Sequence, residues 1–273
     1  MKTIFLFISI SVVAALTAFI VQPNQVCIEV KNRQHLPNGI YEELKSYRAI
    51  LIGEMHGTNE SPQYVEGIVN LWLGNGQKVI LGLEINGNEQ SKIDSFLSTG
   101  YFSIIEKATF FNNTYRDGRN STAIGNLIKS CYGKPNLKVV CLDIANWKIP
   151  NRDSMMAVCE NDMLKSNSGW ALITLTGNIH NKIDSSQYGK TMGWCLCNNP
   201  KSIMTRKDIA SVDVVFNSGS AWCCQPNCGV HKESSSPSWI TNECKYDNFF
   251  RIYRDGTTVL FTKTITASSP LKL

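Results

Sequence analysis

The sequence predicts an α/β fold in which a mostly parallel, open sheet is flanked by helices. Two observations support this prediction. Short apolar runs of the kind that form buried strands alternate with segments of helical periodicity between residues 49 and 216. The composition, with 43% hydrophobic and 18% charged residues among 273, suits one large domain with a sizeable core. We expect a single domain at 26–273, with a cysteine-rich insertion at about 194–245 that forms a disulfide-rich C-terminal appendage, and a terminal β-hairpin.

The first half of this domain alternates strand and helix signals. Before residue 120 we expect strands at 26–30, 49–52 and 79–83 and helices at 41–46, 62–73 and 89–97. The start of the second helix follows from Ser61 and Pro62, which combine an N-cap with a proline at the first helical position. Residues 101–118 hold three phenylalanines and two tyrosines, which fits either a substrate-facing lid or a packed irregular loop.

The second half continues the alternation and ends in two paired strands. After residue 120 we expect helices at 122–131 and 151–165 and strands at 137–142, 171–176 and 212–216. The helix at 151–165 is amphipathic. Its core-facing side is expected to carry Met155, Met156, Cys159 and Met163. Two final strands within 249–264 are joined at Asp255-Gly256, which is a strong hairpin signal.

The first 21 residues have the pattern of a secretory signal peptide. Lys2 is followed by a long apolar run with small residues at Ala14, Ala15 and Ala18, so cleavage is expected after Ala18 or a few residues later. The same run is long enough to serve as an uncleaved membrane anchor, and only in that case do we expect a membrane partner. The protein is therefore expected to be secreted or periplasmic.

Cysteines are concentrated in one part of the chain. Six of the ten lie in a single 50-residue stretch, at Cys195, Cys197, Cys223, Cys224, Cys228 and Cys244. In an exported protein such clustering predicts that they are mainly paired in disulfides. Zinc is an alternative, because Cys224, Cys228, His231 and Cys244 could serve as its ligands, but their spacing matches no common zinc motif.

Titratable residues follow four of the buried strands. Glu54 and His56 come directly after the strand at 49–52, and the next three strand ends carry Glu84, Asp143 and His180. Parallel strands present their carboxyl ends on one edge, so these side chains should lie close together there. We predict that His56 and His180 share one pocket.

Arg152 is a further candidate for this pocket. It falls in the first turn of a predicted helix, where the helix dipole disfavours a cation, so we expect it to have a function. Glu84 and Arg152 are predicted to line the pocket, with Asp143 as a secondary lining residue. The modest net charge of +5 comes from scattered lysines and arginines, so no nucleic-acid partner is expected.

Two GxxH motifs give the sequence a resemblance to a known superfamily. They are GEMH at 53–56 and GNIH at 177–180, and they resemble the superfamily that joins erythromycin esterases, ChaN-type haem-binding proteins and the Tiki/TraB proteases. The further matches are Gly82-Leu83-Glu84, Arg152-Asp153 followed by Met156-Ala157, and Met192-Gly193 with Leu196. The last two are most similar to the esterase branch. Esterases commonly place an extra residue between the acid and the first histidine, whereas here Met55 alone separates them, as in ChaN and Tiki.

The resemblance implies roles for the candidate residues. His56 would be the catalytic base, Glu54 and Glu84 its acidic partners, Arg152 a site arginine and His180 a second essential histidine. The implied activity is that of a secreted hydrolase in which activated water attacks an ester or amide of a small-molecule or peptide substrate.

The same superfamily leaves other readings open. A Tiki-like variant would hold a divalent metal between His56, His180 and Glu84. A ChaN-like protein would instead be an exported carrier of haem or another ligand. A third reading, a host-directed secreted factor whose cysteine-rich part binds a partner, has no specific support in the sequence.

Overall fold

The computed structural model describes residues 26–112, 117–144, 151–185, 187, 189–224, 227–234, 244–253 and 256–271. The expected signal peptide lies outside these residues. The strands are β1 (Cys27–Glu29), β2 (Ala49–Glu54), β3 (Lys78–Asn86), β4 (Leu137–Asp143), β5 (Trp170–Gly177), β6 (Ile209–Cys224), β7 (Cys228–Glu233), β8 (Asn248–Ile252) and β9 (Thr258–Ile265). The α-helices are α1 (Asn38–Leu44), α2 (Glu60–Gly74), α3 (Gln90–Thr99), α4 (Ser103–Glu106), α5 (Thr122–Ser130), α6 (Arg152–Ser166) and α7 (Met192–Asn198). Within the described part, no helix has the length and apolar character needed to cross a membrane.

The strands form one mixed sheet whose centre is parallel. Its order is β1-β8-β9-β6-β2-β5-β3-β4, and β7 pairs with the far end of β6. All neighbours from β9 through β6, β2, β5 and β3 to β4 are parallel. The pairs β1–β8, β8–β9 and β6–β7 are antiparallel. The predicted fold class, a mostly parallel open sheet with a terminal hairpin, is therefore confirmed.

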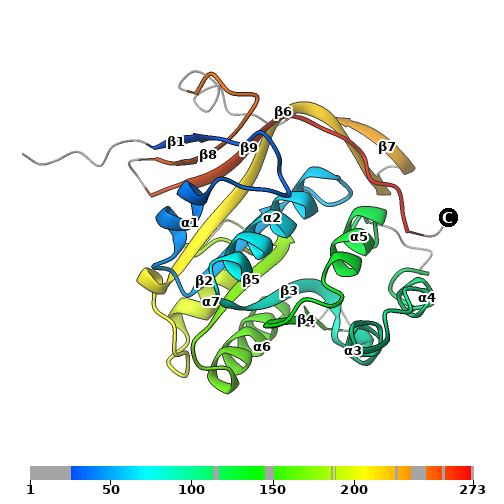
Figure 1. Cartoon of the computed structure of the whole chain (residues 1–273), viewed down its shortest axis with the longest axis horizontal. Helices are drawn as coiled ribbons and strands as arrows, with labels where there is room; N and C mark the ends of the chain where they lie inside the picture. The colour runs from blue at the N-terminus through cyan, green and yellow to red at the C-terminus, as the bar shows by residue number, and fades with distance from the viewer. Residues whose placement is uncertain are drawn as a thin grey trace, which may run out of the picture.

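Helices cover both faces of the parallel part. The side chains of β2 alternate between the faces: Ile50 and Ile52 pack into the core beneath α1, α2, α3 and α5. Ala49 and Leu51 pack into a second core beneath α6 and α7. All six β2 residues are buried, which explains why the strand is almost continuously apolar. Figure 1 shows α2 lying across the middle of the sheet and α6 near the β3–β4 edge.

Helix α6 differs from its predicted orientation. Met156 is fully buried as expected, but Met155 is 44% exposed, so its prediction as a core residue is wrong. Three residues that were not expected in the core are buried: Glu160 completely, together with Asn161 and Leu164. Asn161 finds partners, accepting from the Ile203 backbone N–H at 2.9 Å. Both carboxylate oxygens of Glu160 have no hydrogen-bond partner among the described residues. Burial raises the pKa of Glu160 to about 8.

The cysteine-rich segment is only partly an appendage. Most of helix α7 and all of β6 fall inside it, and both belong to the main layers of the domain. Cys224 is bonded to Cys228 across the β6–β7 turn, and Cys244 is bonded to Cys27. The second bond joins β1 to the segment before β8, at the side of the sheet where Figure 1 shows the blue and orange strands together.

Two of the six clustered cysteines correct the disulfide prediction. Cys195 and Cys197 are thiols on α7. Cys195 is buried in the core beneath α6 and α7, and Cys197 packs against it. The zinc alternative is also wrong, because Cys224, Cys228 and Cys244, three of its four ligands, are in disulfides. Disulfides of this kind are typical of proteins that fold in an oxidising, extracytoplasmic compartment.

Candidate functional site

The predicted site residues meet at the carboxyl edge of the parallel sheet. His56 follows β2 and His180 follows β5, and these two strands are direct neighbours. Both histidines line one cavity of about 370 Å³. The topological prediction that the two GxxH loops share a pocket is confirmed. Glu84 and Arg152 do not line this cavity, contrary to the prediction; they lie behind the two imidazole rings and contact them.

His56 is held between two carboxylates. Its Nδ1 lies 2.9 Å from Oε1 of Glu54, and its Nε2 lies 3.5 Å from Oε2 of Glu84. The short contact at Nδ1 requires a hydrogen there, because the carboxylate only accepts. Burial acts to lower the pKa of His56, but the negative charge of Glu84 and the hydrogen bond to Glu54 outweigh it and raise this pKa. Burial raises the pKa of Glu54.

His180 has a different pair of partners. Its Nδ1 lies 2.6 Å from Oδ1 of Asp153, and its Nε2 lies 2.9 Å from Nη1 of Arg152. A guanidinium only donates, so Nε2 must be the accepting nitrogen and Nδ1 must carry the hydrogen given to Asp153. Asp153 Oδ1 also accepts from the Met192 backbone N–H at 2.7 Å, which fixes the carboxylate against the start of α7. These contacts fix the orientation of the His180 ring, with Nδ1 facing Asp153 and Nε2 facing Arg152.

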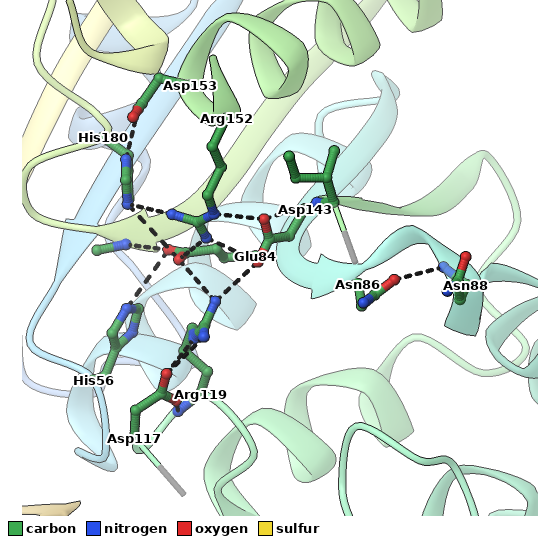
Figure 2. A network of polar contacts seen from close by, with 12 residues as sticks. His56, Glu84, Asn86, Asn88, Asp117, Arg119, Asp143, Arg152, Asp153 and His180 are labelled. Carbon is green, nitrogen blue, oxygen red and sulfur yellow. Dashed lines mark hydrogen bonds and ion pairs between the residues drawn. The ribbon is translucent and has the colours of Figure 1, made fainter. Parts of the chain in front are cut away.

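Glu84 lies at the centre of the cluster, as Figure 2 shows. Its Oε1 accepts from Arg152 at 2.5 Å and from Arg119 at 3.2 Å, and its Oε2 accepts from the Gly177 backbone N–H at 2.8 Å. Burial acts to raise the pKa of Glu84. Its interactions with His56, His180, Arg119 and Arg152 reverse this effect and hold the pKa far below its usual range. Glu84 is thus an ionised carboxylate in the protein interior.

Asp143 completes a network of charged side chains behind the histidines. Arg152 donates to it through Nε at 2.6 Å and Nη2 at 2.8 Å, and Arg119 through Nη1 at 2.9 Å. Burial acts to lower the pKa of both arginines, but hydrogen bonds with Asp117 and Asp143 and the charge of Glu84 raise it. Each guanidinium therefore stays charged and joins two or more carboxylates.

The backbone around His56 is fixed by segments far away in the sequence. Gly57, at a φ of 76°, accepts through its carbonyl from the backbone N–H of Trp222 at 2.9 Å and of Ser268 at 2.8 Å. A Cβ at Gly57 would lie 2.1 Å from the Trp222 carbonyl oxygen, and a Cβ at Gly118 would lie 2.5 Å from the Gly57 nitrogen. Only glycine allows such close approach on both sides. The His56 loop is therefore held between the β6–β7 hairpin and the loop that carries Arg119.

A divalent metal does not fit this donor set. Two of the three residues predicted as its ligands, His180 and Glu84, are bonded to the Arg152 guanidinium through His180 Nε2 and Glu84 Oε1, and the third, His56, is bonded to Glu54 through Nδ1. A cation at that position would have to displace another cation. No group of three or more histidine, cysteine, aspartate or glutamate side chains in the described part has an arrangement suited to a metal ion. We derive no step through a metal.

Three residues of the cluster were not among the predicted site residues. Asp117 lies at the end of the aromatic segment at 101–118 and Arg119 directly after it, and the sequence of this segment has no regular period that would predict their position. Asp153 was noticed only as part of the Arg152-Asp153 match. The sequence signal for Asp153 is its position next to Arg152. Both residues lie in the first turn of α6, so one helix start places the arginine and the carboxylate that bonds His180.

Together these features define an α/β protein with a histidine–carboxylate–arginine cluster at the carboxyl edge of a parallel sheet. No protein-family model and no curated protein matches the sequence. Among solved structures, an erythromycin esterase, an EreC mutant in its open conformation, is similar over 90% of this chain and 98% of its own, with a TM-score of 0.63 and 10% identity. A succinoglycan biosynthesis protein is similar over 89% of this chain and 95% of its own, with a TM-score of 0.62 and 9% identity.

A ChaN structure from Campylobacter jejuni with cofacial haem is similar over 78% of this chain and 98% of its own. The TM-score of this pair is 0.47 at 13% identity. The likeness to the esterase is one of fold alone, given the low identity. The fold implied by the superfamily resemblance is confirmed, while the roles that the resemblance gives to individual residues stay predictions.

Proposed function

We propose that the protein is an exported hydrolase in which His56 activates a water molecule for attack on an ester or amide. The observation that carries this proposal is the pairing of two histidines across one cavity, each with Nδ1 hydrogen-bonded to a carboxylate. The Nε2 atom of His56 has only a 3.5 Å contact, to Glu84 Oε2, whereas that of His180 is bonded to Arg152 at 2.9 Å. A substrate that fits the cavity is a small molecule or a short segment of peptide.

The two histidines have unequal roles in this mechanism. Glu54 orients His56 through Nδ1, so Nε2 can take a proton from water while the hydroxide adds to the carbonyl carbon. The positive charge of Arg152 stabilises the negative charge that develops on the carbonyl oxygen, and His180, bonded to Arg152 and Asp153, holds that guanidinium in position. His56 then passes its proton to the leaving group as the carbon–oxygen or carbon–nitrogen bond breaks. General-base help of this kind contributes typically ~10²- to 10⁴-fold in rate.

The test is hydrolysis of a panel of esters and peptides by the mature protein and two variants. His56→Ala and His180→Ala should each abolish activity while the thermal midpoint stays nearly unchanged, because both side chains are partly exposed at the edge of the sheet. His231→Ala is the matched control, since His231 lies on β7 and does not line the cavity. Full activity in both site variants would overturn the proposal.

The pH dependence of the rate gives a second readout. A base must be neutral to accept a proton, and the pKa of His56 is raised above its usual 6.5. Activity should therefore rise with pH through an inflection above about 6.5 and level off at higher pH. A rate that falls over this interval would require His56 to act as an acid instead.

Two alternative readings are separated by simple additions. A metal-dependent hydrolase would lose its activity on treatment with a chelator, which the proposed mechanism predicts to have no effect. A haem carrier would shift the Soret band of added haemin without hydrolysing any substrate.

A further inference from the structure

Two unlike kinds of side chain line the cavity of the candidate site. The polar ones include Glu54, His56, Asp117 and His180. The residues with sulfur or hydrocarbon side chains are Met55, Ile179, Cys223 and Cys224. We refer to Met55, Ile179 and Cys224 as the apolar wall. Because both kinds line one cavity, a molecule bound beside the imidazoles also has sulfur and hydrocarbon within its reach.

Ile179 is the most informative residue of the apolar wall. It lies between Asn178 and His180, and its side chain is 37% exposed. Hydrogen bonds hold the chain in place on both sides of it. On one side, Asn178 N–H donates to the Glu54 carbonyl at 3.0 Å. On the other side, the fully buried Asn181 donates to the Val212 carbonyl at 3.1 Å. An isoleucine held in solvent by fixed backbone on both sides cannot bury itself in the core, so it presents its surface to the cavity.

Cys224, another residue of the apolar wall, is held by the β6–β7 hairpin. Cys224 ends β6, and its bond to Cys228 closes the turn into β7. Two residues earlier, Trp222 is hydrogen-bonded to Gly57, next to His56. The apolar wall is therefore attached to the same backbone that positions the first histidine. A fixed apolar surface beside a fixed imidazole is the arrangement that gives a pocket selectivity for the group next to the reacting bond.

We propose that the apolar wall is the specificity surface of the site, and that it binds a compact apolar group attached directly to the ester or amide that is hydrolysed. The assignment of the reacting bond rests on the proposed function, whereas binding of the apolar group does not. The volume of about 370 Å³ fits a short alkyl chain or a single ring beside the carbonyl. The substrate class is therefore esters or amides of small apolar acids or alcohols, and strongly charged or highly hydroxylated neighbours of the carbonyl are disfavoured.

Binding can be measured without turnover by using methyl ketones of increasing alkyl length as probes. They carry the carbonyl and the apolar group but no bond that can be hydrolysed, so the unmodified protein can be titrated by calorimetry or NMR. Burial of each added methylene should tighten binding by roughly three- to four-fold until the cavity is filled. Dissociation constants that do not change with alkyl length would overturn the proposal.

Ile179→Ser should flatten this dependence on chain length, and Ile179→Val should weaken it only in part. Ile203→Ser is the matched control, because Ile203 is also an exposed isoleucine, at 41%, but does not line the cavity. Equal flattening in the Ile203 variant would show that the effect is not local and would also overturn the proposal.

Failure of the proposed function is distinguishable from failure of this inference. Ketone binding that tightens with chain length, in a protein that hydrolyses no ester or amide, would support the apolar wall as a binding surface and contradict the proposed hydrolase function. Hydrolysis with no chain-length dependence of binding would support the hydrolase function and contradict the apolar wall as a specificity surface.

Discussion

Glu84 and Glu160 are both buried glutamates on the same side of the sheet, but their pKa values are shifted in opposite directions. Glu84 is 6% exposed and has two arginines, two histidines and a backbone N–H around it. Glu160 is 0% exposed and its oxygens have no hydrogen-bond partner in the described chain. The pKa of Glu84 is lowered, whereas that of Glu160 is raised to about 8. Burial alone therefore does not decide the charge of a carboxyl group; its partners do.

The contrast also separates two uses of a buried acid. Glu84 is ionised, and its charge holds two guanidinium groups and the Gly177 N–H in one geometry behind the histidines. Glu160 is a neutral acid at pH 7, in a helix position that an apolar residue would fill at lower cost. Three substitutions sharpen this comparison, and their expected effects decrease in the order given.

The largest effect is expected from Glu160→Met across a range of pH. The unfolded chain loses the proton of Glu160 at about its ordinary 4.5, while the folded protein keeps it up to about 8. Between these values the folded state binds one more proton, so the stability of the natural protein should fall as pH rises from about 4.5 to 8 and then stay level. The total change is on the order of 5 kcal/mol. Glu160→Met should remove this slope in chemical denaturation curves.

Asp162→Asn provides the control for that experiment. Asp162 lies on the same helix, but its side chain is 65% exposed, so the slope should be retained. A slope that persists in Glu160→Met would assign it to another group.

Glu84→Gln tests the partnered carboxylate. The amide keeps the shape of the side chain but leaves two arginines without their shared charge, which typically costs ~3–5 kcal/mol. Because the pKa of Glu84 is lowered, its contribution is complete above about pH 4.5 and is lost as pH falls further. The difference between the natural protein and the variant should therefore be larger at pH 7 than at pH 3, the reverse of the Glu160 behaviour. Glu42→Gln on the exposed face of α1 should show neither effect.

The smallest of the three effects is expected from Arg119→Gln. This change removes one of two guanidinium groups while Arg152 remains bound to Glu84 and Asp143. Loss of hydrogen bonds to charged groups costs about 1.5–3 kcal/mol. A double-mutant cycle with Glu84→Gln measures the coupling directly. If Arg119→Gln costs as much as Glu84→Gln, the cluster acts as one unit and the ranking is wrong.

Much of the fold was predictable because its centre follows simple rules. Strands β2, β3, β4 and β5 are short apolar runs buried on both faces, and each was expected within a few residues of its observed limits. Strand β6 was expected only at 212–216 but extends from Ile209 to Cys224. The run of Asn217, Ser218 and Gly219 is typical of a turn, yet pairing with β9 and then β7 keeps it extended.

The missed helix and the misjudged face of α6 have physical causes. Helix α7 begins with a Thr191 cap, whose hydroxyl accepts from Trp194 N–H at 3.2 Å, but its two cysteines had been attributed to disulfides. Glu160 was not among the expected core residues of α6, and a carboxylate is rarely buried without a partner. No sequence pattern signals such an exception.

The site was predictable where it depends on strand ends and not where it depends on loops. Parallel pairing of β2 with β5 brings His56 and His180 together without further information. The position of Arg119 depends on how residues 101–118 pack, and that segment has no period from which its path could be inferred.

The two hydrogen bonds accepted by the Gly57 carbonyl decide when, during synthesis of the chain, the backbone beside His56 can become fixed. The carbonyl next to His56 needs Trp222 and Ser268, which are made more than 160 and 210 positions later. A chain that emerges amino end first has the histidine long before it has either partner, and contacts so distant in sequence form late in folding. We expect the backbone beside His56 to be fixed only after residues 266–268 have docked, so an incomplete chain would lack the ordered histidine cluster.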